Sequence, residues 1–110
     1  MIARLWRGWT RPQDGDVYAL FLRSTVFPTV AGSVPGFRGA YVLRREDGSE
    51  DEFLVLTVFE SLEAVRAFAG DEYAVPVIEP EAARLITRGD DLATHYEIVG
   101  HATPPLEARD

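Results

Sequence analysis

The order of the predicted elements places the chain in the α+β class, as a ferredoxin-like βαββαβ sandwich with an antiparallel sheet. Three observations support this class. Four segments have the alternating or continuous apolar pattern of strands, and two amphipathic segments between them have the spacing of helices. Turn-forming residues separate the segments. The resulting order is strand, helix, strand, strand, helix, strand.

The first half of the chain supplies a strand, a helix and a second strand. Residues 2–10 are mostly apolar, with Arg4 and Arg7 between the apolar side chains, and we interpret them as the first strand. A breaker at residues 11–14 precedes a helix capped by Asp14 or Asp16, and Pro28 should kink or end that helix. After a turn, residues 37–45 predict the second strand. The predicted core face of the helix is formed by Val17, Leu20, Phe21 and Phe27.

Residues 53–59 predict a central strand, because only Thr57 among them is not apolar. A hairpin turn at residues 46–49 joins this strand to the previous one. A strand that is apolar on both faces must be covered on both faces. Since the helices of so short a chain cover only one face, we expect a homodimer that pairs sheet against sheet.

The second half of the chain continues with a helix that Ser61 caps and Gly70 ends. An irregular segment follows, and Pro80 then begins a short helix that runs through Ile86. Residues 92–99 alternate again and predict the final strand. We therefore expect one domain followed by a C-terminal tail, with their bounds at residues 1–99 and 100–110.

The composition argues against several classes of function. The 110 residues include no Cys, no Lys and no Asn, and 18 acidic residues outnumber 11 arginines, for a formal net charge of -7. Disulfides, thiolate sites and lysine Schiff bases are therefore excluded, and with two histidines we expect no metal and no cofactor. The acidic balance argues against nucleic acid. The absence of a long apolar run or leader argues against membrane insertion and secretion, so we expect a cytoplasmic protein.

Several segments together resemble the antibiotic biosynthesis monooxygenase family. They are the run from Phe53 to Gly70, the opening Met-Ile-Ala-Arg-Leu-Trp-Arg-Gly, the turn Val-Pro-Gly-Phe-Arg-Gly from Val34, and the closing His-Tyr-Glu-Ile-Val from His95. The resemblance spans nearly all of residues 1–99. It implies a dimeric α+β barrel with a pocket between the sheet and the helices of each subunit. Some members oxidise phenols to quinones with molecular oxygen and no metal or flavin, and others degrade haem.

The family's functional residues match this chain incompletely. Its cofactor-free oxygenases use an asparagine and a tryptophan, but this chain has no asparagine, and the expected helix tryptophan falls near Phe68. The asparagine, tryptophan and axial histidine of the haem-degrading members fall near Leu5, Phe68 and Val77. Haem ligation by the family's route is therefore not expected.

Two aromatic and two basic residues are candidates for substrate binding. Trp9 and Arg7 share a strand face, so the indole could stack on a planar substrate while the guanidinium binds a carboxylate or phenolate. Packing of Trp9 against a helix with Arg7 in solvent is the alternative. Phe68 would either line a pocket or belong to the core. Arg84 would either lie at the entrance of that pocket or be an ordinary surface charge. Trp6, on the opposite face, is assigned to the dimer interface.

Tyr73 and His95 are the candidate catalytic residues. The Tyr73 hydroxyl could bind a phenol or receive its proton, and the alternative is a loop anchor. His95 is the only histidine in the predicted domain, and an imidazole titrates near neutral pH, so it could act as a general base. The alternative is a strand histidine with a hydrogen bond to a neighbour or to solvent.

These observations favour a cofactor-independent monooxygenase that acts on a small aromatic, polyketide-like or quinone-type substrate with molecular oxygen. The missing asparagine and helix tryptophan leave an alternative open. In that alternative, the chain is a non-catalytic dimer of the same fold that binds a small ligand or serves as an accessory subunit.

Overall fold

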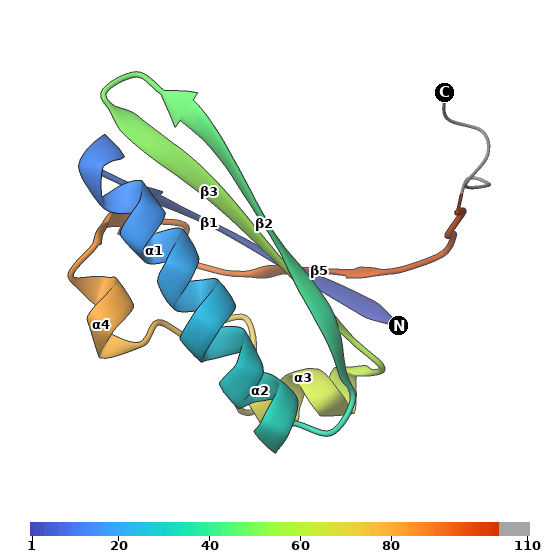
Figure 1. The fold of residues 1–110 in the computed structure, drawn as a ribbon. Coiled ribbons are helices and arrows are strands. Elements are labelled where there is room, and N and C mark those ends of the chain that lie inside the picture. Colours follow the sequence, from blue (N-terminus) through green and yellow to red (C-terminus); the bar gives the residue numbers. More distant parts are fainter. Residues whose placement is uncertain (104–110) are drawn as a thin grey trace.

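The computed structural model describes residues 1–103 and has the predicted α+β ferredoxin-like architecture, with an antiparallel sheet and helices on one of its faces (Figure 1). Residues 104–110 of the predicted tail lie outside the described part. The elements are β1 (Ile2–Thr10), α1 (Gly15–Phe21), α2 (Phe27–Ser33), β2 (Phe37–Asp47), β3 (Glu50–Phe59), α3 (Leu62–Ala69), α4 (Pro80–Ala83), β4 (Ile86–Gly89) and β5 (Thr94–Glu97).

The sheet has the strand order β2-β3-β1, and the far side of β1 pairs with both β4 and β5. All of these pairings are antiparallel. The final strand predicted over residues 92–99 is thus shorter, and β4 is an additional strand that begins at Ile86, the expected last residue of the short helix. The nine residues of β1 leave backbone N–H and C=O groups along one edge. β4 and β5, which residues 90–93 separate, hydrogen-bond to the two ends of that edge.

Residues 15–33 form one continuous helical segment across one face of the sheet (Figure 1). Pro28 does not end the helix. A π-helical turn, Leu22–Val26, joins α1 to α2, and the N–H of Phe27 bonds to the carbonyl of Leu22, five residues back. Because a π-turn leaves some carbonyls without the usual partner, the missing N–H of Pro28 is accommodated there. The Thr29 hydroxyl donates to the Thr25 carbonyl over 2.7 Å.

The buried stripe of this helical segment differs from the predicted one. Val17 and Leu20 are 54% and 51% exposed, so the predicted core face is wrong at these two positions. A stripe repeating every four residues packs against Phe53 and Phe59 of β3 instead. The π-turn widens the local repeat, which keeps this stripe on the sheet side for longer than an ideal helix would. Its members are Tyr18, Leu22, Val26, Val30 and Val34.

Helix α3 begins and ends where the sequence predicts, whereas α4 begins at Pro80 as predicted but ends at Ala83 rather than at Ile86. Ser61 caps α3, its hydroxyl accepting from the N–H of Ala64 over 3.2 Å, and Gly70 ends α3 with a positive φ of 87°. Pro80 occupies the first turn of α4. Among residues 1–103, no helix is long and apolar enough to cross a membrane.

The face of the sheet opposite the helices carries a broad apolar surface. Tyr41, Leu43 and Tyr96 are 70%, 48% and 57% exposed there. The register places half-buried side chains of β1 and β3 between them, namely Leu5, Leu54, Leu56 and Val58. We call these seven residues the open face. In a regular strand Phe37 would lie on the same face as Tyr41, but a register shift between Phe37 and Gly39 turns its ring toward Phe59.

Candidate functional site

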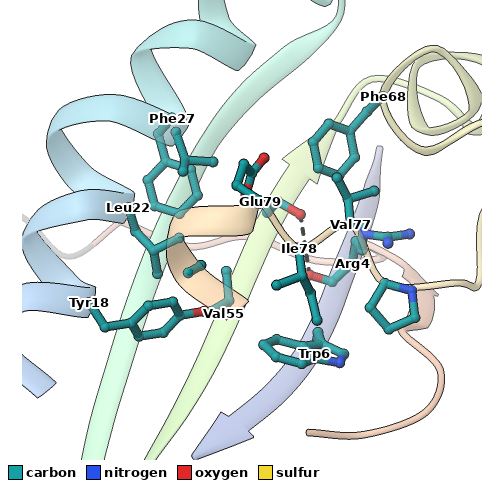
Figure 2. Close-up of a pocket in the computed structure, with 14 residues that line it drawn as sticks. Arg4, Trp6, Tyr18, Leu22, Phe27, Val55, Phe68, Val77, Ile78 and Glu79 are labelled. Atoms are coloured by element: carbon teal, nitrogen blue, oxygen red, sulfur yellow. Dashed lines mark hydrogen bonds between the residues drawn. The ribbon is translucent and has the colours of Figure 1, made fainter. Parts of the chain in front are cut away.

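A pocket of about 60 Å³ lies between the α1–α2 helical segment and the sheet, and residues 76–79 close it (Figure 2). Aliphatic and aromatic side chains make most of its wall. Its polar side chains are those of Arg4, Tyr18, Thr57 and Glu79, with the indole N–H of Trp6. The remaining lining residues are Leu22, Val26, Phe27, Val55, Phe68, Pro76, Val77, Ile78 and Ala82.

Tyr18 supplies a buried hydroxyl to this pocket. The side chain leaves α1 toward the sheet, and its ring meets Phe53 edge-on with centroids 4.9 Å apart. Only 3% of the residue is exposed, and no residue among 1–103 hydrogen-bonds its hydroxyl. Burial, and secondarily the charge of Glu79, raises the pKa of Tyr18 well above its ordinary value. The group is therefore a neutral phenol that can donate one hydrogen bond to a ligand oxygen.

Arg4 reaches from β1 under residues 73–77. It is 5% exposed, and its Nη1 donates to the Tyr73 carbonyl while its Nη2 donates to the Val75 carbonyl over 3.1 Å. The guanidinium carbon lies 5.5 Å from the centroid of the Phe68 ring, within the range of a cation–π contact. Burial lowers the pKa of Arg4, yet an arginine remains charged at neutral pH. The pocket therefore has a cation in its wall.

His95 contacts Arg4 and does not line the pocket. Its Nε2 lies 2.9 Å from Nη1 of Arg4. Because a guanidinium has only donors, Nε2 must accept, so the imidazole is neutral with its proton on Nδ1. Burial and then the charge of Arg4 lower the pKa of His95, in agreement with that state. The Tyr73 ring meets this imidazole edge-on at 5.0 Å.

Trp6 forms one wall of the pocket, and two glycines allow it to lie there. Its indole N–H donates to the Asp90 carbonyl over 2.8 Å. The ring lies against Gly8 of β1 and Gly89 of β4, which are paired across the two strands. A Cβ atom at Gly8 or Gly89 would come within 2.5 Å or 2.3 Å of the ring, so the indole packs directly on backbone.

The structure separates the six predicted site residues into four groups. Phe68 lines the pocket. Tyr73 and His95 lie together behind Arg4, outside the lining. Arg7 and Trp9 share the opposite face of the sheet, as their alternation predicted, and Arg7 pairs there with Asp90 at 3.0 Å. Arg84 is exposed at the end of α4.

The faces assigned to the two tryptophans are exchanged in the structure. Trp6, expected at the dimer interface, lines the pocket. Trp9 lies on the other side of the sheet, the side opposite the helices. Trp9 is covered there by its polar neighbours: its N–H donates to Asp47 over 2.8 Å, and the Arg88 guanidinium carbon lies 3.9 Å from the ring centroid. The assignment of Trp6 to the interface is therefore corrected.

Two pocket residues, Tyr18 and Arg4, and the glycine under the Trp6 ring, Gly8, were not singled out from the sequence, although signals for Tyr18 and Gly8 exist. Tyr18 begins the four-residue repeat that continues through Leu22 and Val26, and this repeat marks the buried stripe. Gly8 lies two residues after Trp6 on the same strand face, where a missing side chain leaves room for a large ring. No sequence signal distinguishes Arg4 from the other arginines.

Comparisons with known proteins agree with the observed fold. A model of the antibiotic biosynthesis monooxygenase family matches residues 24–75, which confirms the resemblance seen in the sequence. No curated protein sequence matches the chain. Its fold is similar to that of a protein of unknown function from Nitrosomonas europaea, at 20% identity and a TM-score of 0.64, with 94% of each chain covered.

Two further solved structures of the same fold contain ligands. A monooxygenase from the ActVA-Orf6 gene of Streptomyces coelicolor, in complex with nanaomycin D, is 16% identical with a TM-score of 0.60, covering 94% of this chain and 92% of that one. The haem degrader MhuD from Mycobacterium tuberculosis, with two haems in its active site, is 23% identical with a TM-score of 0.56, covering 94% of this chain and 100% of that one. These similarities show the shared fold.

Proposed function

Because the chain resembles antibiotic biosynthesis monooxygenase domains in both sequence and fold, we propose that it is a monooxygenase that oxidises a small aromatic substrate with molecular oxygen and without a resident cofactor. The observation that carries the proposal is the pocket between helix and sheet. Its walls are mostly apolar and aromatic, and the hydroxyl of the largely buried residue Tyr18 has no hydrogen-bond partner within residues 1–103. Such a wall with a few fixed polar groups is typical of small-molecule sites.

A reaction with oxygen and no cofactor requires a substrate that supplies its own electrons. A phenol conjugated to a methylene group, as in an anthrone, forms an anion that can transfer an electron to oxygen. In the full reaction the methylene carbon loses two hydrogens and gains one oxygen atom of O₂ as a carbonyl. The other oxygen atom leaves with those two hydrogens as water. Oxygen is the only oxidant, and the carbon supplies all four electrons.

The role of the protein in this reaction is to bind the substrate and stabilise its anion. Trp6 and Phe68 present ring faces and edges for a planar substrate. The neutral Tyr18 hydroxyl donates a hydrogen bond to the substrate oxygen as negative charge develops on it. The apolar walls exclude water, which strengthens this hydrogen bond.

Oxygen consumption tests the proposal directly. We expect the purified protein to take up oxygen with at least one member of a panel of anthrones and hydroquinones. The Tyr18→Phe variant should lose about tenfold or more of kcat/KM, corresponding to one buried hydrogen bond to a charged oxygen. Tyr41→Phe is the matched control, because Tyr41 is 70% exposed on the other side of the sheet. No uptake with any member of the panel would refute the proposed reaction.

A non-catalytic ligand-binding protein is the second candidate, and one observation favours it. The groups predicted to take a proton, Tyr73 and His95, lie outside the pocket lining, and His95 Nε2 already accepts from Arg4. In this case the protein would bind quinones and phenols without consuming oxygen. Calorimetric titration alongside the oxygen assay separates the two candidates.

The lining residues argue against haem as the ligand of this pocket. An axial ligand to iron is commonly a histidine, cysteine or methionine, and none of these is among the lining residues. Within residues 1–103, no cluster of histidine and acidic residues could hold a metal ion. We therefore expect no shift of the Soret band when haem is mixed with the protein, and a shift would reopen haem degradation as a function.

The open face supports the proposal that two copies pair sheet against sheet. An exposed apolar surface this broad is unusual on a monomer. Leu43→Glu should shift the protein toward a monomer in sedimentation velocity, because burying an unpaired carboxylate is costly. Leu20→Glu is the matched control, since Leu20 is 51% exposed on the helical side against 48% for Leu43. A monomeric wild-type protein at micromolar concentration would contradict the pairing.

A further inference from the structure

We propose that the ligand of this pocket carries an anionic oxygen group, a carboxylate or an ionised phenol, that binds to Arg4. The inference rests on the pocket identified above and narrows its ligand from any aromatic molecule to an aromatic anion. It depends on the position of Arg4 in the pocket wall, on its burial, and on the partners that its guanidinium has and lacks.

Arg4 is a buried cation without a carboxylate partner among residues 1–103. This is unusual in a chain with 18 acidic residues. Acidic side chains pair instead with exposed or half-exposed arginines, which are Arg7, Arg11, Arg38, Arg44, Arg45 and Arg88. A buried charge that lacks an opposite charge costs several kcal/mol, so its retention in a pocket wall indicates a role beyond packing.

The hydrogen bonds of Arg4 leave donors free for a ligand. A guanidinium has five N–H groups. Three of them are used, by the Tyr73 carbonyl, the Val75 carbonyl and Nε2 of His95. The other two have no acceptor among residues 1–103. All three partners are electrically neutral, so they hold the guanidinium in place and leave its charge available.

Other residues that line the pocket can bind the ring and a second oxygen of an aromatic anion. Phe68, whose ring lies against the Arg4 guanidinium, can contact the ring of the ligand beside its charged group. Tyr18 approaches the pocket from the helical side and can bind a second oxygen of the ligand. Glu79 also lines the pocket, and its charge disfavours an anion near it and near Tyr18, so we place the anionic group of the ligand at the Arg4 end.

Two pairs of matched ligands test the inference by isothermal titration calorimetry. Naphthoate is compared with naphthamide, and hydroxynaphthoquinone, which is ionised at neutral pH, is compared with its methyl ether. None of these compounds has a methylene to oxygenate, so the result does not depend on the proposed reaction. For the wild-type protein we expect the anion of at least one pair to bind tighter by on the order of tenfold to a hundredfold. Which pair responds distinguishes a carboxylate from an ionised phenol.

Substitutions at Arg4 separate anion binding from a merely structural role. Arg4→Gln should abolish the preference for the anion, Arg4→Lys should keep most of it, and Arg7→Gln on the opposite face should leave it unchanged. Equal binding of both members of each pair to the wild-type protein would overturn the inference, as would no binding of any compound at millimolar concentration. Equal weakening of anion and neutral ligand in Arg4→Gln would also overturn it, since Arg4 would then only hold residues 73–75. If Arg4→Gln does not fold, the wild-type comparison still decides.

Discussion

Adding one methyl group at Gly89 should destabilise the fold through Trp6. The Cβ of Gly89→Ala would lie 2.3 Å from Cζ2 of the indole and 3.0 Å from Cη2, well inside van der Waals contact. Gly89 itself is held in the ladder opposite Gly8 of β1. Because the strand cannot retreat without breaking this pairing, the indole must move.

The cost of this substitution follows from two losses. Forcing an extra carbon against a packed ring costs about 1–3 kcal/mol, since the ring leaves its preferred rotamer or the backbone shifts. The displaced indole also loses its 2.8 Å hydrogen bond to the Asp90 carbonyl, worth about 0.5–1.5 kcal/mol. We therefore expect the free energy of unfolding to fall by about 2–4 kcal/mol. In a domain of this size that corresponds to a decrease in Tm of roughly 10 °C or more.

Urea denaturation at fixed protein concentration, followed by circular dichroism, measures the change, and tryptophan fluorescence reports the new environment of the indole. The matched control is Gly32→Ala in α2, where a Cβ would meet nothing within 4 Å. That variant should gain up to about 1 kcal/mol, because alanine favours a helix over glycine. If Gly89→Ala unfolds within about 0.5 kcal/mol of the wild type and its fluorescence is unchanged, the indole does not pack on the Gly89 backbone.

Three further predictions concern the helix ends and the histidine. Ser61→Ala should lower the free energy of unfolding by about 1 kcal/mol, since the cap to the Ala64 N–H is lost, and Ser61→Asp should restore most of it in the same urea titration. Gly70→Ala should cost about 1–3 kcal/mol, because the φ of 87° combined with a ψ of -178° is a backbone conformation that essentially only glycine adopts. Because burial and then Arg4 lower the pKa of His95, the protein should be most stable above about pH 6.5, and stability should fall as the pH drops through the lowered pKa. His95→Gln should flatten this decline, and an equal pH dependence in that variant would contradict the assignment.

The sequence was sufficient to predict the elements whose signals are local. The strand at residues 2–10, the cap at Ser61 and the end at Gly70 depend on alternation, side-chain capping and glycine conformation, all of which operate within a few residues. The helix through Pro28 was not predictable in this way. Its continuation depends on a π-turn, and the chain adopts that turn because the stripe from Tyr18 to Val34 packs on β3.

The site was harder to predict because its geometry depends on which strand face meets the helices. Alternation correctly placed Trp6 and Trp9 on opposite faces, yet it contains no information on which face is inward. The deciding interactions are long-range: Trp6 packs against Gly89, and Arg4 bonds to carbonyls about 70 residues away. Such contacts become visible only once the last strands pair with β1.

The size of the pocket determines how a ligand can enter it. About 60 Å³ is far below the roughly 300–1,000 Å³ of typical ligand sites, so part of the wall must move when an aromatic molecule binds. Regular backbone hydrogen bonds hold the helical segment and the sheet. Residues 76–79 have no regular secondary structure, and Val77 and Ile78 are each 41% exposed. The hydrogen bonds from Arg4 reach only Tyr73 and Val75, just before that segment. We therefore expect residues 76–79 to open while the guanidinium stays fixed, so that specificity comes from the charged end of the ligand and the apolar end tolerates variation.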